Sequence, residues 1–142
     1  MLKMLIAVDG SDHARRAIEA AAHLGRQVSQ AEALILNVGD GLVFYGELPA
    51  LDYEAVELAR RQAQQQLLQD AQAHALACGL KTVSTLSAEG ATASEIARVA
   101  DEQGVDQIVM GTQGKGVLGS LFLGSTAQRV VHLANVPVML VK

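Results

Sequence analysis

Short apolar runs alternate with stretches of helical periodicity along the chain, and this alternation constrains the fold more than any other feature. Each run has the length of a strand, and each intervening stretch is long enough for a helix that crosses back over a sheet. Strands joined in this way give a right-handed, doubly wound parallel sheet. The sequence therefore predicts an α/β fold, a five-stranded parallel sheet with helices on both faces; its apolar runs are residues 2–8, 33–38, 82–86, 105–110 and 138–141.

Polar residues and glycines indicate where the helices begin and end. Ser11 or Asp12 can cap the first helix, whose apolar side continues to Val28. Two later segments have the capping-box pattern, a Ser or Thr followed three residues later by Glu or Gln; they are Thr92-Ala-Ser-Glu95 and Ser125-Thr-Ala-Gln128. Gly79 and Gly104 stand where helix C-termini are expected.

The longest helix is predicted over residues 52–78, after a loop at residues 39–49. Its apolar residues recur at close to helical spacing and predict a single buried side. This side consists of Val56, Ala59, Ala63, Leu67, Ala71, Ala75 and Cys78.

Composition narrows the class of protein. A chain of 142 residues has room for one domain, which we expect to span residues 1–142. Its 50% hydrophobic and 18% charged content is typical of an α/β domain whose sheet is covered on both faces. No apolar stretch is long enough to span a bilayer, so we expect no membrane partner. The lone Cys78 rules out an intrachain disulfide and favours a reducing, cytoplasmic location.

The same composition argues against two kinds of ligand. A net charge of −4 and the scarcity of aromatic residues disfavour a nucleic-acid partner, because such binding relies on clustered cations and stacking. The histidines are scattered without metal-ligand spacing, at positions 13, 23, 74 and 132.

A glycine-rich segment from Gly111 to Ser125 connects the fourth apolar run to the last helix, and it indicates a phosphate-binding loop. It is not a Walker loop, because Gly116 follows Lys115 and Val109 stands where the first glycine belongs. The run Gly114-x-Gly116-x-x-Gly119 matches the dinucleotide pattern by accident, since an apolar loop follows it and no acidic residue lies at the required distance.

Ligands of open α/β sheets bind beyond the carboxyl ends of the strands, where the strand order reverses. The residues at those ends carry a family resemblance. The spacing Gly111-x2-Gly114-x9-Gly124-Ser125 resembles the ATP-binding signature of the universal stress protein family. Asp9-Gly-Ser11 after the first strand, Asn37-Val38 after the second and Glu89-Gly90 before the third helix extend the resemblance over essentially the whole chain.

The resemblance implies a sheet ordered 3-2-1-4-5 with a nucleotide across the ends of strands 1, 2 and 4. Asp9 would then lie near the phosphates and a Mg²⁺ ion, and Val38 would offer backbone groups to adenine. It also implies a two-fold dimer through the edge strand Val138–Val141. The remaining implied ligand residues are Ala7, Met110, Gly111, Gln113, Gly114, Gly124, Ser125 and Thr126.

Each of these residues also has an interpretation that needs no ligand. Asp9 can simply hold its turn or cap the first helix, and Ser125 is expected to be a helix N-cap in either case. Gly111 can serve tight packing alone, and Val38 can be an ordinary strand end. Lys115 can reach a phosphate, but an exposed loop lysine is more often only solvated.

The function that the resemblance implies is an ATP-binding regulatory protein of the stress response. One carboxylate and one lysine near the loop supply little catalytic machinery, so at most slow ATP hydrolysis is expected. Two alternatives remain, a non-nucleotide interaction module that acts as a dimer, and a nucleotidyl-transfer or pyrophosphatase enzyme of related fold.

Overall fold

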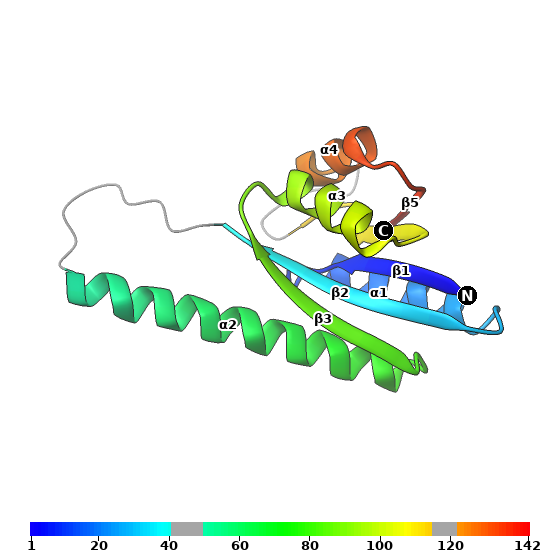
Figure 1. Ribbon diagram of the computed structural model, residues 1–142, viewed down its shortest axis with the longest axis horizontal. Coiled ribbons are helices and arrows are strands. Elements are labelled where there is room, and N and C mark those ends of the chain that lie inside the picture. The colour runs from blue at the N-terminus through cyan, green and yellow to red at the C-terminus, as the bar shows by residue number, and fades with distance from the viewer. Residues whose placement is uncertain (41–49, 115–121) are drawn as a thin grey trace.

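The computed structural model describes residues 1–40, 50–114 and 122–142, and within them strands alternate with helices (Figure 1). The strands form one sheet in the order β3-β2-β1-β4-β5, and every neighbouring pair is parallel, which confirms the predicted fold class and strand order. The elements are β1 (Leu2–Ala7), α1 (Asp12–Gly25), β2 (Ala31–Gly39), α2 (Ala50–Ala77), β3 (Thr82–Glu89), α3 (Thr92–Gln103), β4 (Gln107–Gly111), α4 (Ser125–Leu133) and β5 (Val138–Val141).

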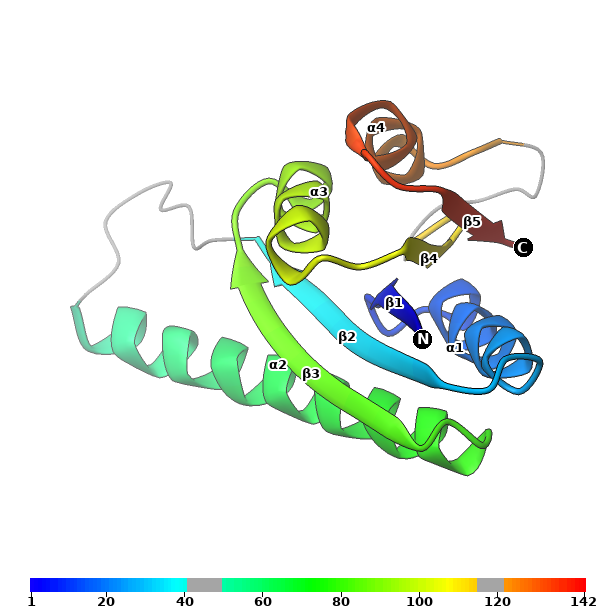
Figure 2. The same ribbon diagram turned by 45° about the vertical axis from the view of Figure 1, so that its right-hand side comes forward.

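Alternate side chains of the sheet enter two separate cores. Met4 and Ile6 of β1 pack with α1 and α2, whereas Leu5 between them packs with α3 and α4. Figure 2 shows the same division, with α1 and α2 on one face of the sheet and α3 and α4 on the other. Because both faces are covered, the central strands are apolar at nearly every position, as their sequences predict.

The start of α1 and the end of α3 are as predicted. Ser11 is the N-cap of α1, and its Oγ accepts a hydrogen bond from the Ala14 N–H at 3.2 Å. Gly104 ends α3 in the left-handed conformation, at φ 61°, which glycine adopts without steric cost.

The predicted capping boxes are wrong by one residue. Ala91 and Gly124 are the N-caps of α3 and α4, and neither helix has a side-chain capping bond. Thr92 and Ser125 are instead the first helical residues, so the helices do start at the two segments, as predicted, but without the predicted side-chain caps. The pattern marks the neighbourhood of a helix start, whereas the extended dihedrals that define the cap are set by how the preceding loop approaches the helix.

Several element ends also differ from the prediction. Helix α1 ends at Gly25, and Val28 lies beyond it with an exposed side chain. Strand β4 begins at Gln107 because the Val105 N–H is bonded to Ala100 at the end of α3. Strand β3 continues through Glu89, since its pairing with β2 extends to the end of that longer strand.

The buried side of α2 covers only its C-terminal half. Leu68, Ala71 and Ala75 are buried against the sheet, as predicted for the last two. Val56, Ala59 and Ala63 were expected on the same buried side, and they are exposed. The helix is longer than the sheet beneath it, so its N-terminal half projects past the ends of β2 and β3 (Figure 1).

Replacing a core side chain of β2 tests this arrangement. Ile35 is fully buried between β2 and the helices of its face, so Ile35→Ala should lower the free energy of unfolding by about 2–5 kcal/mol. Leu58→Ala, on the projecting half of α2, should change it by less than about 0.5 kcal/mol. Urea unfolding measures both, and similar losses at the two positions would contradict the assigned burial.

Candidate functional site

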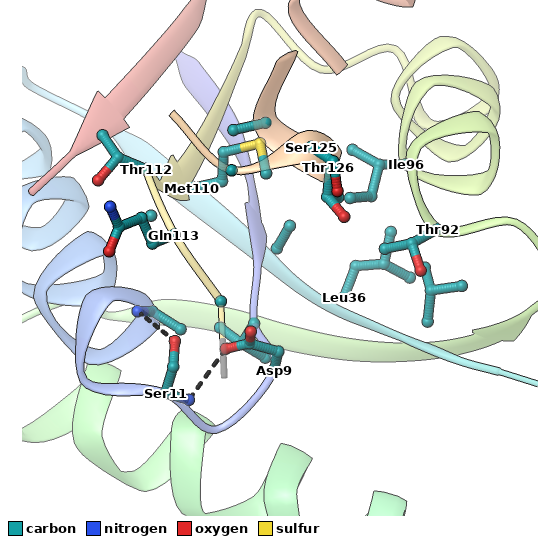
Figure 3. Close-up of a pocket in the computed structure, with 18 of the residues that line it drawn as sticks. Asp9, Ser11, Leu36, Thr92, Ile96, Met110, Thr112, Gln113, Ser125 and Thr126 are labelled. Atoms are coloured by element: carbon teal, nitrogen blue, oxygen red, sulfur yellow. Dashed lines mark hydrogen bonds between the residues drawn. The ribbon is translucent and has the colours of Figure 1, made fainter. Parts of the chain in front are cut away.

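A cavity of about 360 Å³ lies at the carboxyl ends of β1, β2 and β4 (Figure 3). It is at the point where the sheet order reverses, since β2 and β4 lie on opposite sides of β1. The first turns of α3 and α4 complete its wall. The lining residues are Ala7, Val8, Asp9, Ser11, Ala14, Leu36, Val38, Asp40, Thr92, Ile96, Met110, Gly111, Thr112, Gln113, Gly114, Gly124, Ser125, Thr126 and Ala127.

Every ligand residue that the sequence predicted lines this one cavity. They come from segments far apart in the chain, with Ala7 and Asp9 at the end of β1, Val38 near the end of β2 and the others between Met110 and Thr126. The fold therefore brings the predicted residues together, while their contact with a ligand stays a prediction. Lys115 lies outside the described residues.

The turn after β1 holds Asp9 at the cavity wall. Gly10 has a φ of 81°, which turns the chain sharply toward α1. The Asp9 Oδ1 atom accepts a hydrogen bond from the Ser11 N–H at 2.9 Å, so the carboxylate does hold its own turn. Figure 3 shows Asp9 and Ser11 side by side on one wall of the cavity. This structural role does not remove Asp9 from the site, since the residue still lines the cavity.

The signature glycines allow close approach within the protein itself. A Cβ atom at Gly111 would lie 2.6 Å from the His13 Cβ atom, and one at Gly114 would lie 2.6 Å from Asp9 Oδ2. A Cβ atom at Gly124 would lie 3.1 Å from the Thr112 carbonyl oxygen. None of the three has a positive φ, so unusual dihedrals do not explain them. Their first requirement is tight packing around the cavity, the interpretation that the sequence alone could not separate from ligand binding.

The N-terminus of α4 forms one side of the cavity. Gly124 donates its N–H to the Thr112 carbonyl oxygen at 2.7 Å, which ties the helix start to the end of β4. The following N–H groups of the first turn have no acceptor within the helix, and the helix dipole makes this end electropositive. Ser125 and Thr126 lie at this helix start in Figure 3. An anionic group placed here would be stabilised.

Another part of the cavity wall is apolar. Leu36, Ile96 and Met110 are buried, and they line it together with Ala7 and Val38. Thr92 and Ile96 were missed by the sequence analysis, although both lie in the first turns of a helix that starts near the strand ends. A flat, apolar group such as a heterocyclic base suits this surface.

Val38 directs its backbone groups toward the cavity. Along a strand these groups point alternately to one side and the other. The Leu36 carbonyl accepts the Val8 N–H on the β1 side, and the Gly39 carbonyl accepts the Gly90 N–H on the β3 side. Val38 has the same orientation as Leu36, so its N–H and C=O point past the end of β1, where the cavity lies.

Among the described residues, the ionisable side chains that line the cavity are acidic. Asp9 and Asp40 both line it, and no Lys, Arg or His side chain does so among the described residues. Asp40 was missed, although it immediately follows β2 and the rule of strand ends could have found it. Phosphates near two carboxylates are stabilised only with help from the α4 N-terminus and a bound cation. In the described part of the chain, no group of three His, Cys, Asp or Glu side chains is arranged to hold a metal ion.

Glu89 and Asn37 lie beside the cavity without lining it. Glu89 pairs with Arg60 of α2, which also bonds Glu57 at 2.8 Å. The hydrogen bond from Arg60 lowers the pKa of Glu57 below its ordinary value. Asn37 donates to the Val8 carbonyl oxygen at 2.7 Å. Both residues of the family resemblance therefore connect strand ends to their surroundings.

None of the described helices is both long enough and apolar enough to span a membrane.

Comparisons with known proteins converge on one family. The model of the universal stress protein family matches residues 1–142. The universal stress protein YxiE of Bacillus subtilis is 35% identical, with 99% of this chain and 98% of that protein covered. The solved structure of UspA from Lactobacillus plantarum superposes with a TM-score of 0.83 at 26% identity, covering 99% of this chain and 97% of the other.

Two further solved structures of this fold hold nucleotides. One is a universal stress protein in complex with cAMP, at a TM-score of 0.69, 23% identity and coverage of 99% and 96%. The other is the universal stress protein from Archaeoglobus fulgidus in complex with dAMP, at a TM-score of 0.66, 23% identity and coverage of 100% and 98%. At this level of identity they establish likeness of fold.

A double-mutant cycle tests the contact between Gly114 and Asp9. Gly114→Ala should lower the free energy of unfolding by about 1–3 kcal/mol, because its methyl group meets the Asp9 carboxylate. In an Asp9→Ala background, Gly114→Ala should lower the free energy of unfolding by a smaller amount, the difference being about 1 kcal/mol or more. The methyl group of Gly111→Ala would meet His13 instead. This substitution should therefore lower the free energy of unfolding by the same amount in both backgrounds. Additive losses for Gly114 and Asp9 would show that the contact is absent.

Proposed function

Because this chain belongs to the universal stress protein family, we propose that it is an ATP-binding regulatory protein of the stress response, one nucleotide-binding domain spanning residues 1–142. The observation that carries the proposal is the convergence of the predicted ligand residues on a single cavity at the switch point of the sheet. Residues that only pack within separate parts of the fold would not be expected to line a single cavity.

The apolar and polar groups of the cavity wall support an orientation for the nucleotide. The adenine ring would lie on the apolar part of the wall beside Leu36, with its polar edge at the backbone of Val38. The phosphates would lie at Gly124, Ser125 and Thr126, where the helix N-terminus favours negative charge. Gly111, Gln113 and Gly114 would line the ribose and phosphate path.

A cation completes this proposal. Asp9 and Asp40 would repel a triphosphate, and Mg²⁺ commonly combines one or two carboxylates with phosphate oxygens. We therefore propose Mg²⁺ as a companion of ATP, with Asp9 as its protein ligand. The complexes of related structures with cAMP and dAMP support a nucleotide as the ligand class, and ATP is the finer part of the proposal.

Efficient catalysis is not part of the proposed function. Phosphoryl transfer needs cations placed around the transferred group and a positioned nucleophile. The described lining offers two carboxylates and several hydroxyls for this work. We expect ATP hydrolysis to be slow at most, so that the nucleotide acts mainly as a bound signal, in a protein of the cytoplasm.

The open edge of β5 supports a homodimer. The Pro137 carbonyl accepts a hydrogen bond from Ile108 of β4, and the Val141 carbonyl accepts one from Thr112, just after β4. The backbone groups of Val138 and Leu140, which lie between them, therefore point to the open edge. An apolar edge strand with exposed N–H and C=O groups is a liability unless another strand pairs with it. Pairing with the same strand of a second copy would satisfy these groups. The same edge is what the alternative function, a dimeric interaction module without nucleotide, would use.

Titration calorimetry tests ATP binding. The wild-type protein should bind ATP, more tightly when Mg²⁺ is present, and Gly114→Val should raise the Kd at least about tenfold by filling the space beside Asp9. Leu58→Ala, far from the cavity on α2, should leave the Kd unchanged. Mass spectrometry of the denatured wild-type protein should also detect a co-purified nucleotide. No heat of binding and no nucleotide would favour the interaction module, and rapid product formation would favour an enzyme.

Sedimentation analysis tests the dimer. At micromolar concentration the wild-type protein should have twice the mass of one chain. Leu140→Pro removes an N–H that points to the open edge and should shift the protein to the monomer, whereas the ladder with β4 is retained. Circular dichroism checks that this variant is folded. A monomeric wild-type protein would overturn the proposed pairing.

A further inference from the structure

The end of β2 extends beyond the strand that should support it. Strand β1 pairs with β2 only as far as Ala7 and Leu36, whereas β2 continues to Gly39 and stays paired with β3 on its other side. Val38 lies in this overhanging part. Its backbone groups face the cavity, so nothing in the β1–β2 ladder fixes their position.

Two amide side chains stabilise the overhang. Asn37 reaches across the end of β1 and donates to the Val8 carbonyl oxygen at 2.7 Å. Gln64 of α2 donates from Nε2 to Asn37 Oδ1 at 3.0 Å and to the Asn37 carbonyl oxygen at 3.3 Å. The same Nε2 atom is 3.3 Å from the Ala88 carbonyl oxygen of β3. One side chain of a helix thus connects to β2 and β3 directly, and to β1 through Asn37.

The contact requires a hydrogen-bond donor at position 64. All three partners of Gln64 Nε2 are oxygen acceptors, so a carboxylate of the same shape would be repelled. The helix also approaches β2 closely here, since a Cβ atom at Gly39 would lie 2.8 Å from Arg60 Nη1 and 3.3 Å from Gln64 Nε2. Val38 lies between the two residues, Asn37 and Gly39, that contact this part of α2.

We propose that Gln64 is a positioning residue of the nucleotide site, which holds the Val38 backbone in place to read the edge of the base. The inference rests on the proposed function, because it assigns Val38 to the base. Gln64 does not line the cavity, and it acts through Asn37. Its loss should weaken binding of the base and the ability to distinguish bases, and it should leave the phosphate end unchanged.

The test compares Gln64→Glu with Gln65→Glu, its exposed neighbour on the same helix, so that both variants add the same charge. Calorimetry measures the Kd values of ATP, GTP and adenosine for the folded proteins. Gln64→Glu should raise the Kd values of ATP and adenosine by a similar factor, about five- to tenfold. It should also reduce the preference for ATP over GTP. Gln65→Glu should match the wild type. Gln64→Lys, which keeps an N–H donor, should recover part of the loss.

The possible results separate this inference from the proposed function. A wild-type protein that binds no nucleotide overturns the proposed function itself. A wild-type protein that binds ATP, with an unchanged Kd and base preference in Gln64→Glu, overturns only the role of Gln64. A loss of affinity for ATP without a loss for adenosine would place the effect at the phosphates. This result would also overturn the proposed role of Gln64. If Gln64→Glu does not fold, Gln64→Met removes the donor without adding charge, and the same losses are expected of it.

Discussion

The early end of β1 is the constraint on which the site depends. Because β1 stops pairing at Ala7, its neighbours β2 and β4 continue beyond it and leave an opening in the middle of the sheet. The chain cannot fill that opening with another strand, since β1 turns sharply at Gly10 into α1. The first turns of α3 and α4 close it from one face. The cavity is therefore a consequence of strand length and connection rather than of any single side chain.

Small residues allow the elements around this opening to approach one another. Alanine forms much of the buried face of α1, which brings that helix close to the sheet. Gly111 lets β4 end against the backbone of His13, and Gly124 lets the start of α4 bond the end of β4. Larger side chains at these points would separate the walls of the cavity. The glycine pattern that resembles a ligand-binding signature is thus, in the first instance, a packing requirement that shapes the ligand site.

The electrostatics of the cavity are divided between backbone and side chains. The side chains contribute the negative charges of Asp9 and Asp40, whereas the N-terminus of α4 contributes a positive partial charge. A phosphate group is compatible with this arrangement when it lies at the helix end and shares a cation with the carboxylates. On the β2 side, uncharged amides stabilise the wall: Asn37 and Gln64 hold strand ends in place without adding charge next to the base.

The sequence by itself determined the class of fold and the identity of most cavity residues. Apolar runs alternate with amphipathic stretches, and a parallel doubly wound sheet is the arrangement that buries both; the strand order, which the family resemblance implied, is confirmed. The residues after each strand could be named because carboxyl ends of parallel strands meet at one edge. Local patterns were less informative about detail: the caps at Thr92 and Ser125 were wrong, and Val56, Ala59 and Ala63 were assigned to a buried side that they do not have.

Tertiary structure decided what periodicity cannot specify. How far α2 extends past the sheet depends on the lengths of β2 and β3, so helical spacing alone could not show which apolar residues of α2 are covered. The close approaches at Gly111, Gly114 and Gly124 depend on His13, Asp9 and Thr112, which are brought near by the strand order. The contacts of Gln64 with Asn37 and Ala88 join three segments that no sequence pattern links. Sequence fixes which side chains can make such contacts, and packing distances between elements decide which of them do.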